Sequence, residues 1–281
     1  MFASNPFSEL GTIIPPAAMQ AYVVIMAILV VGGTILDVIH KKSAKYFFEH
    51  GKKAEKARKR ELSGGEKASI AMQTVGHDVL TSGEFCNPKR RASHLMMMYG
   101  FIVFLLTTVI MVFGYASPMA ATPGILPVLW HLGALSVSIG GLWFWFAIRV
   151  DVSAEGNPWY RVAQADLFIL SLLGTNLFGL IWSILQSSQA GGWTVLFLIL
   201  FIVSSLVLFA GVLWSKFAHM FFKPAAAYQK RILKADGSRE NLPEPADRSD
   251  PAQRDRRSME LLKDAPMDMG LGIKREAPRH Y

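Results

Sequence analysis

Apolar residues dominate five long stretches of the chain, and polar residues separate them. The stretches run from about Ala18 to Ile39, Leu95 to Tyr115, Leu126 to Ile148, Leu167 to Gln186 and Trp193 to Ser215. Each is close to the roughly 20 residues that an α-helix needs to cross the hydrocarbon core of a bilayer. The pattern therefore predicts an all-α integral membrane bundle of five transmembrane helices.

The first stretch is expected to stay in the membrane as an anchor rather than to be removed as a signal peptide. No basic segment opens the chain, and seventeen mostly uncharged residues come before the stretch. Asp37 and the run His40–Lys42 follow it, which does not resemble a small-residue cleavage site. We expect residues 1–17 to form an outer N-terminal segment and residues 18–40 to form the first span.

Basic residues are distributed unevenly between the connecting segments. Of the 29 Lys and Arg, 13 lie in residues 41–92 and 14 lie from Lys216 onward, whereas residues 116–125 and 187–192 carry no charge. Basic segments are retained in the cytoplasm. The sequence therefore predicts an outer N-terminus and a cytoplasmic C-terminus. Aromatic belts are then expected at the two interfaces, formed by Tyr115, Trp130 and Trp193 outside and by Trp159, Tyr160 and Trp214 inside.

Two segments are expected outside the bilayer on the cytoplasmic side. Residues 41–93 form a basic loop that begins as a helix at the membrane surface and breaks at Ser63–Gly65. Residues 94–223 are assigned to the bundle of spans two to five. Residues 224–281 form a basic tail, which from about Asn241 is rich in Pro, Asp, Arg and Ser. Such a composition favours disorder or folding on a partner.

Composition narrows the chemistry that is open to this chain. Its one cysteine excludes an intrachain disulfide and a cysteine-ligated iron–sulfur cluster, and Cys86 is interpreted as an inert thiol. No phosphate-binding or dinucleotide-binding glycine motif is present. The net charge of +8 is explained by cytoplasmic basic segments, so no nucleic-acid partner is expected. We expect a multi-pass protein of the cell inner membrane that contacts membrane lipid.

Two histidines flank the bundle at its expected cytoplasmic end. His94 opens the second span and His219 closes the fifth. Two neutral imidazoles on different helices can ligate one haem iron axially, which predicts a single b-type haem. Gly100 is expected to leave room for the flat macrocycle. The candidate partners of the haem propionates are Arg90, Arg91, Lys216 and Lys223. The alternative is that each histidine is only a polar tip in the headgroup region.

Quinone is the expected lipid-soluble electron carrier, and four residues are candidates for binding it. His131 stands at the outer side, where the alternative is a simple interfacial position. Asp37, Arg149 and Asp166 stand at the inner side. Asp37 could instead cap a helix or pair with a lysine, and Asp166 could pair with Arg161 or Arg149. His40 is a substitute haem ligand, whereas His50, His77 and His280 are left unassigned.

The five spans resemble the cytochrome b membrane subunits of the nitrate reductase gamma type. That family implies five helices, an outside N-terminus and two stacked haems, each ligated by one histidine from helix two and one from helix five. His94 and His219 match the inner pair. The positions of the outer pair fall near Phe104 and Phe201, which cannot ligate iron, so the second haem is not expected.

A closer resemblance is to the membrane anchor of adenylylsulfate (APS) reductase and to the membrane part of the quinone-interacting oxidoreductase of sulfur metabolism. It is carried by residues 40–49, 81–85, 87–94 and 216–224, and it covers most of residues 18–235. The resemblance implies a cytoplasmic redox enzyme, similar to APS reductase, as the partner. Electrons would pass between that enzyme and the quinone pool through this subunit.

Three functions are therefore compared. The first is an electron-transfer subunit that carries haem and reacts with quinone. The second is a haem-free membrane anchor that only tethers the cytoplasmic enzyme. The third is a transporter or channel, which is disfavoured because the spans lack mid-membrane charge and the chain lacks an internal repeat.

Overall fold

The computed structural model describes residues 2–41, 43–83, 85, 87–151, 156–215, 217, 219–242 and 252. Within these residues every regular element of secondary structure is a helix. Five helical segments are long and apolar enough to cross a membrane: Pro16–His40, Pro88–Gly114, Ile125–Ile148, Gln164–Ser187 and Gly192–Leu213. By length and composition the chain is a multi-pass membrane protein, which confirms the all-α class and the five spans.

The spans are built from helices α2 (Pro16–Lys41), α5 (Pro88–Gly114), α6 (Ile125–Trp143), α7 (Leu167–Ser187) and α8 (Gly192–Ala210). Short helical segments extend three of them: the π-helix η2 (Phe144–Ile148) and the 3-10 helices η3 (Gln164–Asp166) and η4 (Gly211–Leu213). Helix α5 begins seven residues before the expected Leu95. The Asn87 side chain accepts hydrogen bonds from the backbone N–H groups of Lys89 and Arg90 there, and Pro88 occupies the first turn.

Glycines allow α5 and α6 to approach closely. A Cβ on Gly100 would lie 2.8 Å from the carbonyl oxygen of Gly133, and a Cβ on Gly133 would lie 2.8 Å from that of Gly100. The Ser93 hydroxyl also donates to the Gly140 carbonyl at 2.8 Å across the same contact. Small residues favour such close helix contacts in membranes. The expectation that Gly100 makes room for a macrocycle is therefore wrong, because backbone of α6 occupies that space.

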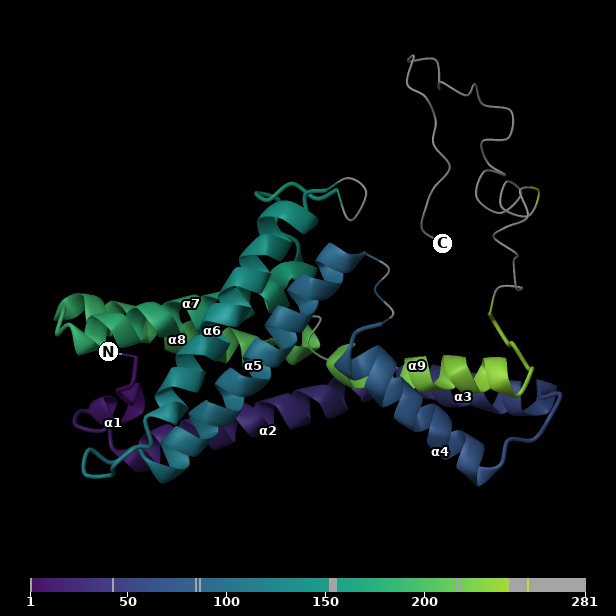
Figure 1. The fold of residues 1–281 in the computed structure, drawn as a ribbon, viewed down its shortest axis with the longest axis horizontal. Coiled ribbons are helices and arrows are strands. Elements are labelled where there is room, and N and C mark those ends of the chain that lie inside the picture. The colour runs from purple at the N-terminus through teal and green to yellow at the C-terminus, as the bar shows by residue number, and fades with distance from the viewer. Residues whose placement is uncertain are drawn as a thin grey trace, which may run out of the picture.

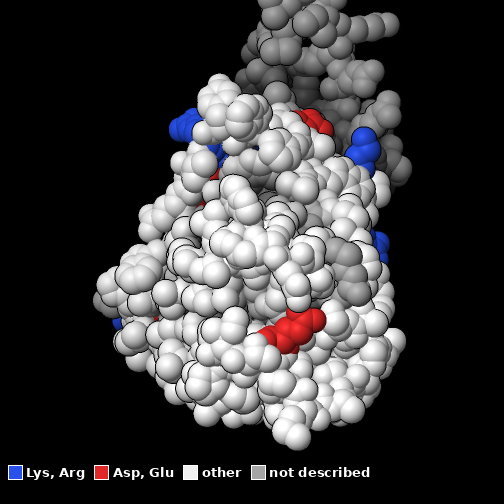
Figure 2. All heavy atoms as spheres, turned by 90° about the vertical axis from the view of Figure 1, so that its left-hand side faces the viewer, with Lys and Arg blue, Asp and Glu red and all other residues white. Residues whose placement is uncertain are grey.

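The end of the bundle that carries α1 (Pro6–Leu10) is named here the charge-poor end. Glu9 is the single Asp, Glu, Lys or Arg in residues 2–36, 95–148 and 167–215. Figure 2 looks onto this end and shows an almost entirely uncharged surface. The segment around α1 is tied down by Asn5, whose Nδ2 donates to the Tyr115 carbonyl at 2.9 Å, and by Gln186, whose Nε2 donates to the Pro6 carbonyl at 2.8 Å.

Aromatic side chains fill the bundle interior behind α1. Phe7 lies 5.9 Å from Trp130 and 5.7 Å from Trp182, measured between ring centroids. Trp130 is fully buried and donates to the Thr108 hydroxyl at 2.9 Å. Its expected place in an interfacial belt is therefore wrong, whereas Trp193, Trp159, Tyr160 and Trp214 are all exposed. The apolar pattern of a span does not distinguish a tryptophan buried within the bundle from one at the membrane interface.

At the opposite end, four helical elements form what we name the basic extension: α3 (Ser43–Ala57), α4 (Gly64–Gln73), η1 (Thr74–Leu80) and α9 (His219–Ala235). Helix α3 continues from α2, and α9 lies along α3 while α4 crosses below (Figure 1). Residues 43–80 and 219–242 hold 13 Lys and Arg against 7 Asp and Glu. The extension thus combines the expected basic loop with the start of the expected tail. The tail from residue 243 onward, Ala252 excepted, lies outside the described residues, as do Cys86 and His280.

Candidate functional site

His94 lies two turns into α5, at the end of the bundle nearest the basic extension. Its position is set by the early start of that helix at Pro88. Residues seven apart share a face of an α-helix, so His94 and Phe101 lie on one side of α5. Phe101 is buried and stacks on Phe209 of α8, with 6.4 Å between ring centroids. Phe101 on this side of α5 thus contacts the last turn of α8, whereas His94 itself contacts Ser82 and Phe85.

His219 is placed differently from the expectation that it closes the fifth span. Helix α8 ends at Ala210, and η4 and a turn follow before α9 begins at His219. The His219 side chain lies outside the described residues. Phe217 is buried beside Phe209, at 6.3 Å between ring centroids, and Phe222 packs against the core of the bundle. The segment around the start of α9 is thus held against the bundle.

The His94 ring is held by a loop that the sequence did not single out as a site. The hydroxyl of Ser82 lies 3.0 Å from His94 Nδ1, and the Phe85 ring lies 4.9 Å from the imidazole between centroids. Ser82 is only 2% exposed. A serine before a helix start carries no distinctive sequence signal, so this contact could be found only from the fold.

The candidate propionate-binding cations take different positions. Arg91 Nε donates to the Thr81 carbonyl at 2.6 Å, and the Arg90 guanidinium lies 5.9 Å from the centre of the Phe85 ring. Both therefore lie around the loop that contacts His94. Lys223 is exposed on α9, and Lys216 lies outside the described residues.

Arg149 and Asp166 are brought together as an ion pair. Arg149 Nη2 lies 2.6 Å from Asp166 Oδ2, and its guanidinium also donates to the carbonyls of Pro158 at 2.7 Å and Arg161 at 2.6 Å. Arg149 is 2% exposed and lies 4.2 Å from the centre of the Trp145 ring. The pair closes the connection between the third and fourth spans, and of the two arginines considered for Asp166 the structure selects Arg149.

Asp37 and His131 lie apart from that pair. Asp37 is 2% exposed on α2, one turn after Gly33, where a Cβ would lie 3.0 Å from Val212 Cβ in η4. His131 is 5% exposed near the charge-poor end, so it is a buried residue rather than an interfacial one. Its Nδ1 lies 2.6 Å from the Pro127 carbonyl and its Nε2 lies 2.9 Å from the Ser183 hydroxyl.

These two contacts use both nitrogens of the His131 ring. A carbonyl oxygen only accepts, so Nδ1 carries a proton, and in the neutral imidazole Nε2 then accepts from the Ser183 hydroxyl. Any quinone bound there would have to replace one of these contacts.

The positions near Phe104 and Phe201 belong to the aromatic core of the bundle. Phe104 lies 5.1 Å from Trp130, and Phe201 stacks on Trp182 at 5.6 Å with 10° between the ring planes. Helix α7 approaches this stack closely, since a Cβ on Gly179 would lie 3.3 Å from Phe201. Packed aromatic rings thus stand where the resemblance would have placed a second pair of ligands.

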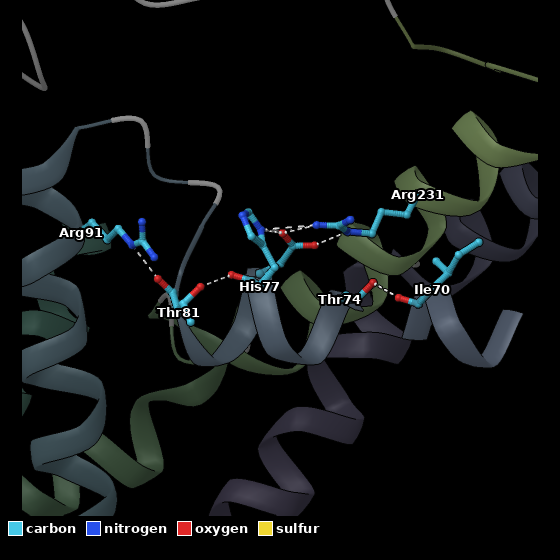
Figure 3. Close-up of polar contacts among 7 residues, drawn as sticks. Ile70, Thr74, His77, Thr81, Arg91 and Arg231 are labelled. Atoms are coloured by element: carbon cyan, nitrogen blue, oxygen red, sulfur yellow. Dashed lines mark hydrogen bonds and ion pairs between the residues drawn. The ribbon is translucent and has the colours of Figure 1, made fainter. Parts of the chain in front are cut away.

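An ion pair joins η1 to α9 next to the His94 loop (Figure 3). Arg231 donates to both carboxylate oxygens of Asp78, from Nε at 2.6 Å and from Nη2 at 2.9 Å. These hydrogen bonds, with a further one from His77, lower the pKa of Asp78 from its ordinary 3.8 to about 2. A two-pronged arginine–carboxylate contact sets orientation as well as energy, so it fixes how α9 sits on η1.

The remaining histidines among the described residues lie in or near the basic extension. His50 Nδ1 contacts Gln229 Nε2 at 3.2 Å, His77 lies beside Asp78, and His40 is exposed at the end of α2.

Comparison of the chain with protein-family models, curated proteins and solved structures finds no significant match.

Proposed function

We propose that this protein is a membrane electron-transfer subunit that links the quinone pool to a soluble redox enzyme through one b-type haem near the basic end of the bundle. The observation that carries the proposal is the placement of His94. Phe101, on the same side of α5, stacks on Phe209 at the end of α8, and the chain then leads through buried Phe217 to His219. The proposal brings both histidines to one corner of the bundle.

The residues present fit such a haem in their chemistry. The Nδ1 atom of His94 faces the Ser82 hydroxyl, so an iron bound to this ring would take Nε2. His219 would supply the second imidazole. Four cationic residues lie near the two histidines in the sequence and carry the charge that propionates need: Arg90, Arg91, Lys216 and Lys223. A haem held there would carry the two electrons of a quinol one at a time, in either direction.

A cytoplasmic location of the basic end is part of the proposal. It is supported by the concentration of Lys and Arg at that end and by their absence from the opposite turns. The protein would then lie in the cell inner membrane with its N-terminus outside. Reporter fusions after residue 10 and after residue 242 would test this orientation, and a cytoplasmic signal from the first fusion would reject it.

The soluble partner is proposed to be a redox enzyme of sulfur metabolism similar to APS reductase. The sulfur chemistry is supported by the sequence resemblance, and the mode of contact is supported by the charge of the basic extension. Positive surface steers an acidic partner into a defined orientation more than it adds affinity. Binding of the partner to vesicles that contain the full chain, and its loss at high salt, would test this contact.

The quinone site is proposed near one of the buried polar groups already described, His131, Asp37, Arg149 or Asp166. Arg149 and Asp166 hold each other and the connecting loop, which favours a structural role for this pair. His131 is the candidate at the opposite end, where the hydroxyl of a quinol could take the place of the Ser183 hydroxyl as the donor to Nε2. Photolabelling with a quinone analogue would distinguish the two ends.

The decisive experiment is the optical spectrum of the purified full-length protein. We expect a b-type difference between reduced and oxidised states, lost in His94→Ala and in His219→Ala. His77→Ala is the matched control, because His77 is an exposed histidine of the basic extension that would not ligate iron. A colourless wild-type protein that elutes as a folded particle and still recruits the enzyme would replace the proposal with a haem-free tether.

A further inference from the structure

The backbone of Leu80 and Thr81, at the start of the loop that holds Ser82, is attached to α5 on both sides of His94. Arg91, three residues before His94, donates from Nε to the Thr81 carbonyl at 2.6 Å. Tyr99, five residues after it, donates from its hydroxyl to the Leu80 carbonyl at 2.6 Å. Because the two contacts flank His94 along the helix, the loop has little freedom to slide relative to the imidazole.

Ser82 occupies an uncommon backbone conformation in this loop. Its φ is 49°, in the left-handed region, which costs on the order of 1 kcal/mol for a residue other than glycine. Neighbouring hydrogen bonds hold it there, from Phe85 N to the Ser82 carbonyl at 3.1 Å and from Gly83 N to the His77 carbonyl at 2.8 Å. The result of this conformation is a buried hydroxyl 3.0 Å from His94 Nδ1.

We propose that Ser82 is a positioning residue for His94 that sets the properties of the haem iron, an inference that rests on the proposed function. When iron occupies Nε2, the proton of the imidazole must be on Nδ1, so Nδ1 donates to Ser82 Oγ. A hydrogen bond of this kind fixes the ring orientation and makes the ligand more basic. A more basic ligand stabilises the ferric state, and the reduction potential of the haem falls.

The same loop connects His94 to the basic extension. It follows directly from η1, and the Asp78–Arg231 pair holds η1 on α9 (Figure 3). Ser82 is four positions after Asp78 in the chain. The segment formed by η1 and the following loop therefore contacts both His94 and the basic extension, which is the surface expected to meet the soluble enzyme.

The test compares Ser82→Ala and Ser82→Gly in the full-length haem-loaded protein. Both variants remove the hydroxyl, but only glycine adopts a φ of 49° without strain. If the hydrogen bond matters, both variants raise the midpoint potential and weaken haem retention about tenfold. Thr81→Ala is the matched control, because the Thr81 hydroxyl donates to the His77 carbonyl at 2.7 Å rather than to His94.

The outcomes separate this inference from the function on which it rests. Raised potentials in both Ser82 variants, with Thr81→Ala unchanged, support it. A wild-type b-type spectrum with the same potential and haem retention in all three variants overturns the role of Ser82 and leaves the proposed function standing. A loss confined to Ser82→Ala, absent in Ser82→Gly, assigns Ser82 to backbone geometry alone and also overturns it. A wild-type protein without haem overturns both.

Discussion

Gly100 and Gly133 face each other across the contact between α5 and α6, with the backbone of each in the space that a side chain on the other would need. A Cβ at either position would lie 2.8 Å from the opposite carbonyl oxygen. Neither oxygen can rotate away as a flexible side chain would, so the two helices would have to separate.

Gly100→Ala is therefore expected to destabilise the bundle by about 1–3 kcal/mol, the usual cost of overpacking. Gly32→Ala is the matched control, because a Cβ at this helical glycine of α2 meets nothing within 4 Å. The control should be neutral or slightly stabilising. Thermal unfolding in detergent measures the difference, and equal midpoints for the two variants would contradict the close contact.

The Asp78–Arg231 pair is expected to make the docking of α9 dependent on pH. Folding lowers the pKa of Asp78 to about 2, so the carboxylate contributes stability that is fully present above about pH 4. That contribution is lost as the pH falls from about 4 to about 2. Titration of α9 docking by hydrogen exchange measures the effect.

Substitutions test the same pair at neutral pH. Asp78→Asn and Arg231→Gln should each cost on the order of 1 kcal/mol, and the double variant should cost less than their sum. Glu49→Gln removes an exposed pair with Lys45 at 3.7 Å and serves as the control, with little expected effect. Strict additivity of the two single variants would show that the pair adds nothing to the packing of α9.

Arg149→Met is expected to destabilise the connection between the third and fourth spans by about 3 kcal/mol. The substitution leaves Asp166 and the carbonyls of Pro158 and Arg161 without their buried cation. Arg161→Met is the control, because Arg161 is exposed. Limited proteolysis between residues 156 and 166 reports the loss, and equal cleavage of the two variants would argue against this role of Arg149.

Phe7→Ala is expected to release α1 from the charge-poor end. Phe7 is 5% exposed and lies against Trp130 and Trp182, so its removal should cost about 3 kcal/mol of local stability. Faster hydrogen exchange over residues 6–11 is the readout. Ile13→Ala, at a side chain that is 82% exposed, should leave the exchange rates unchanged. Unchanged exchange in Phe7→Ala would mean that Asn5 and Gln186 hold the segment without the ring.

Local properties of the chain were sufficient to predict the number and approximate limits of the spans. Each span is a run of apolar residues about as long as a bilayer is thick, and no distant residue is needed to recognise it. The start of α5 could also be predicted from the sequence, because Asn87 followed by Pro88 is a local signal for a helix N-terminus. The run Ser63–Gly65 likewise predicts a break in the basic loop, and the structure adds a capping box formed there by Ser63 and Glu66.

The rotation of each helix within the bundle could not be obtained in this way, because the spans are apolar on every side and lipid is as apolar as a protein core. Sequence alone therefore determined that the chain crosses a membrane five times with unequal charge at its two ends. Only the tertiary structure decided that Gly100 packs on Gly133, that Trp130 is buried and that Arg149 holds Asp166. It also brought Ser82 to His94, because contacts between segments depend on the packing of whole helices, which no local pattern encodes.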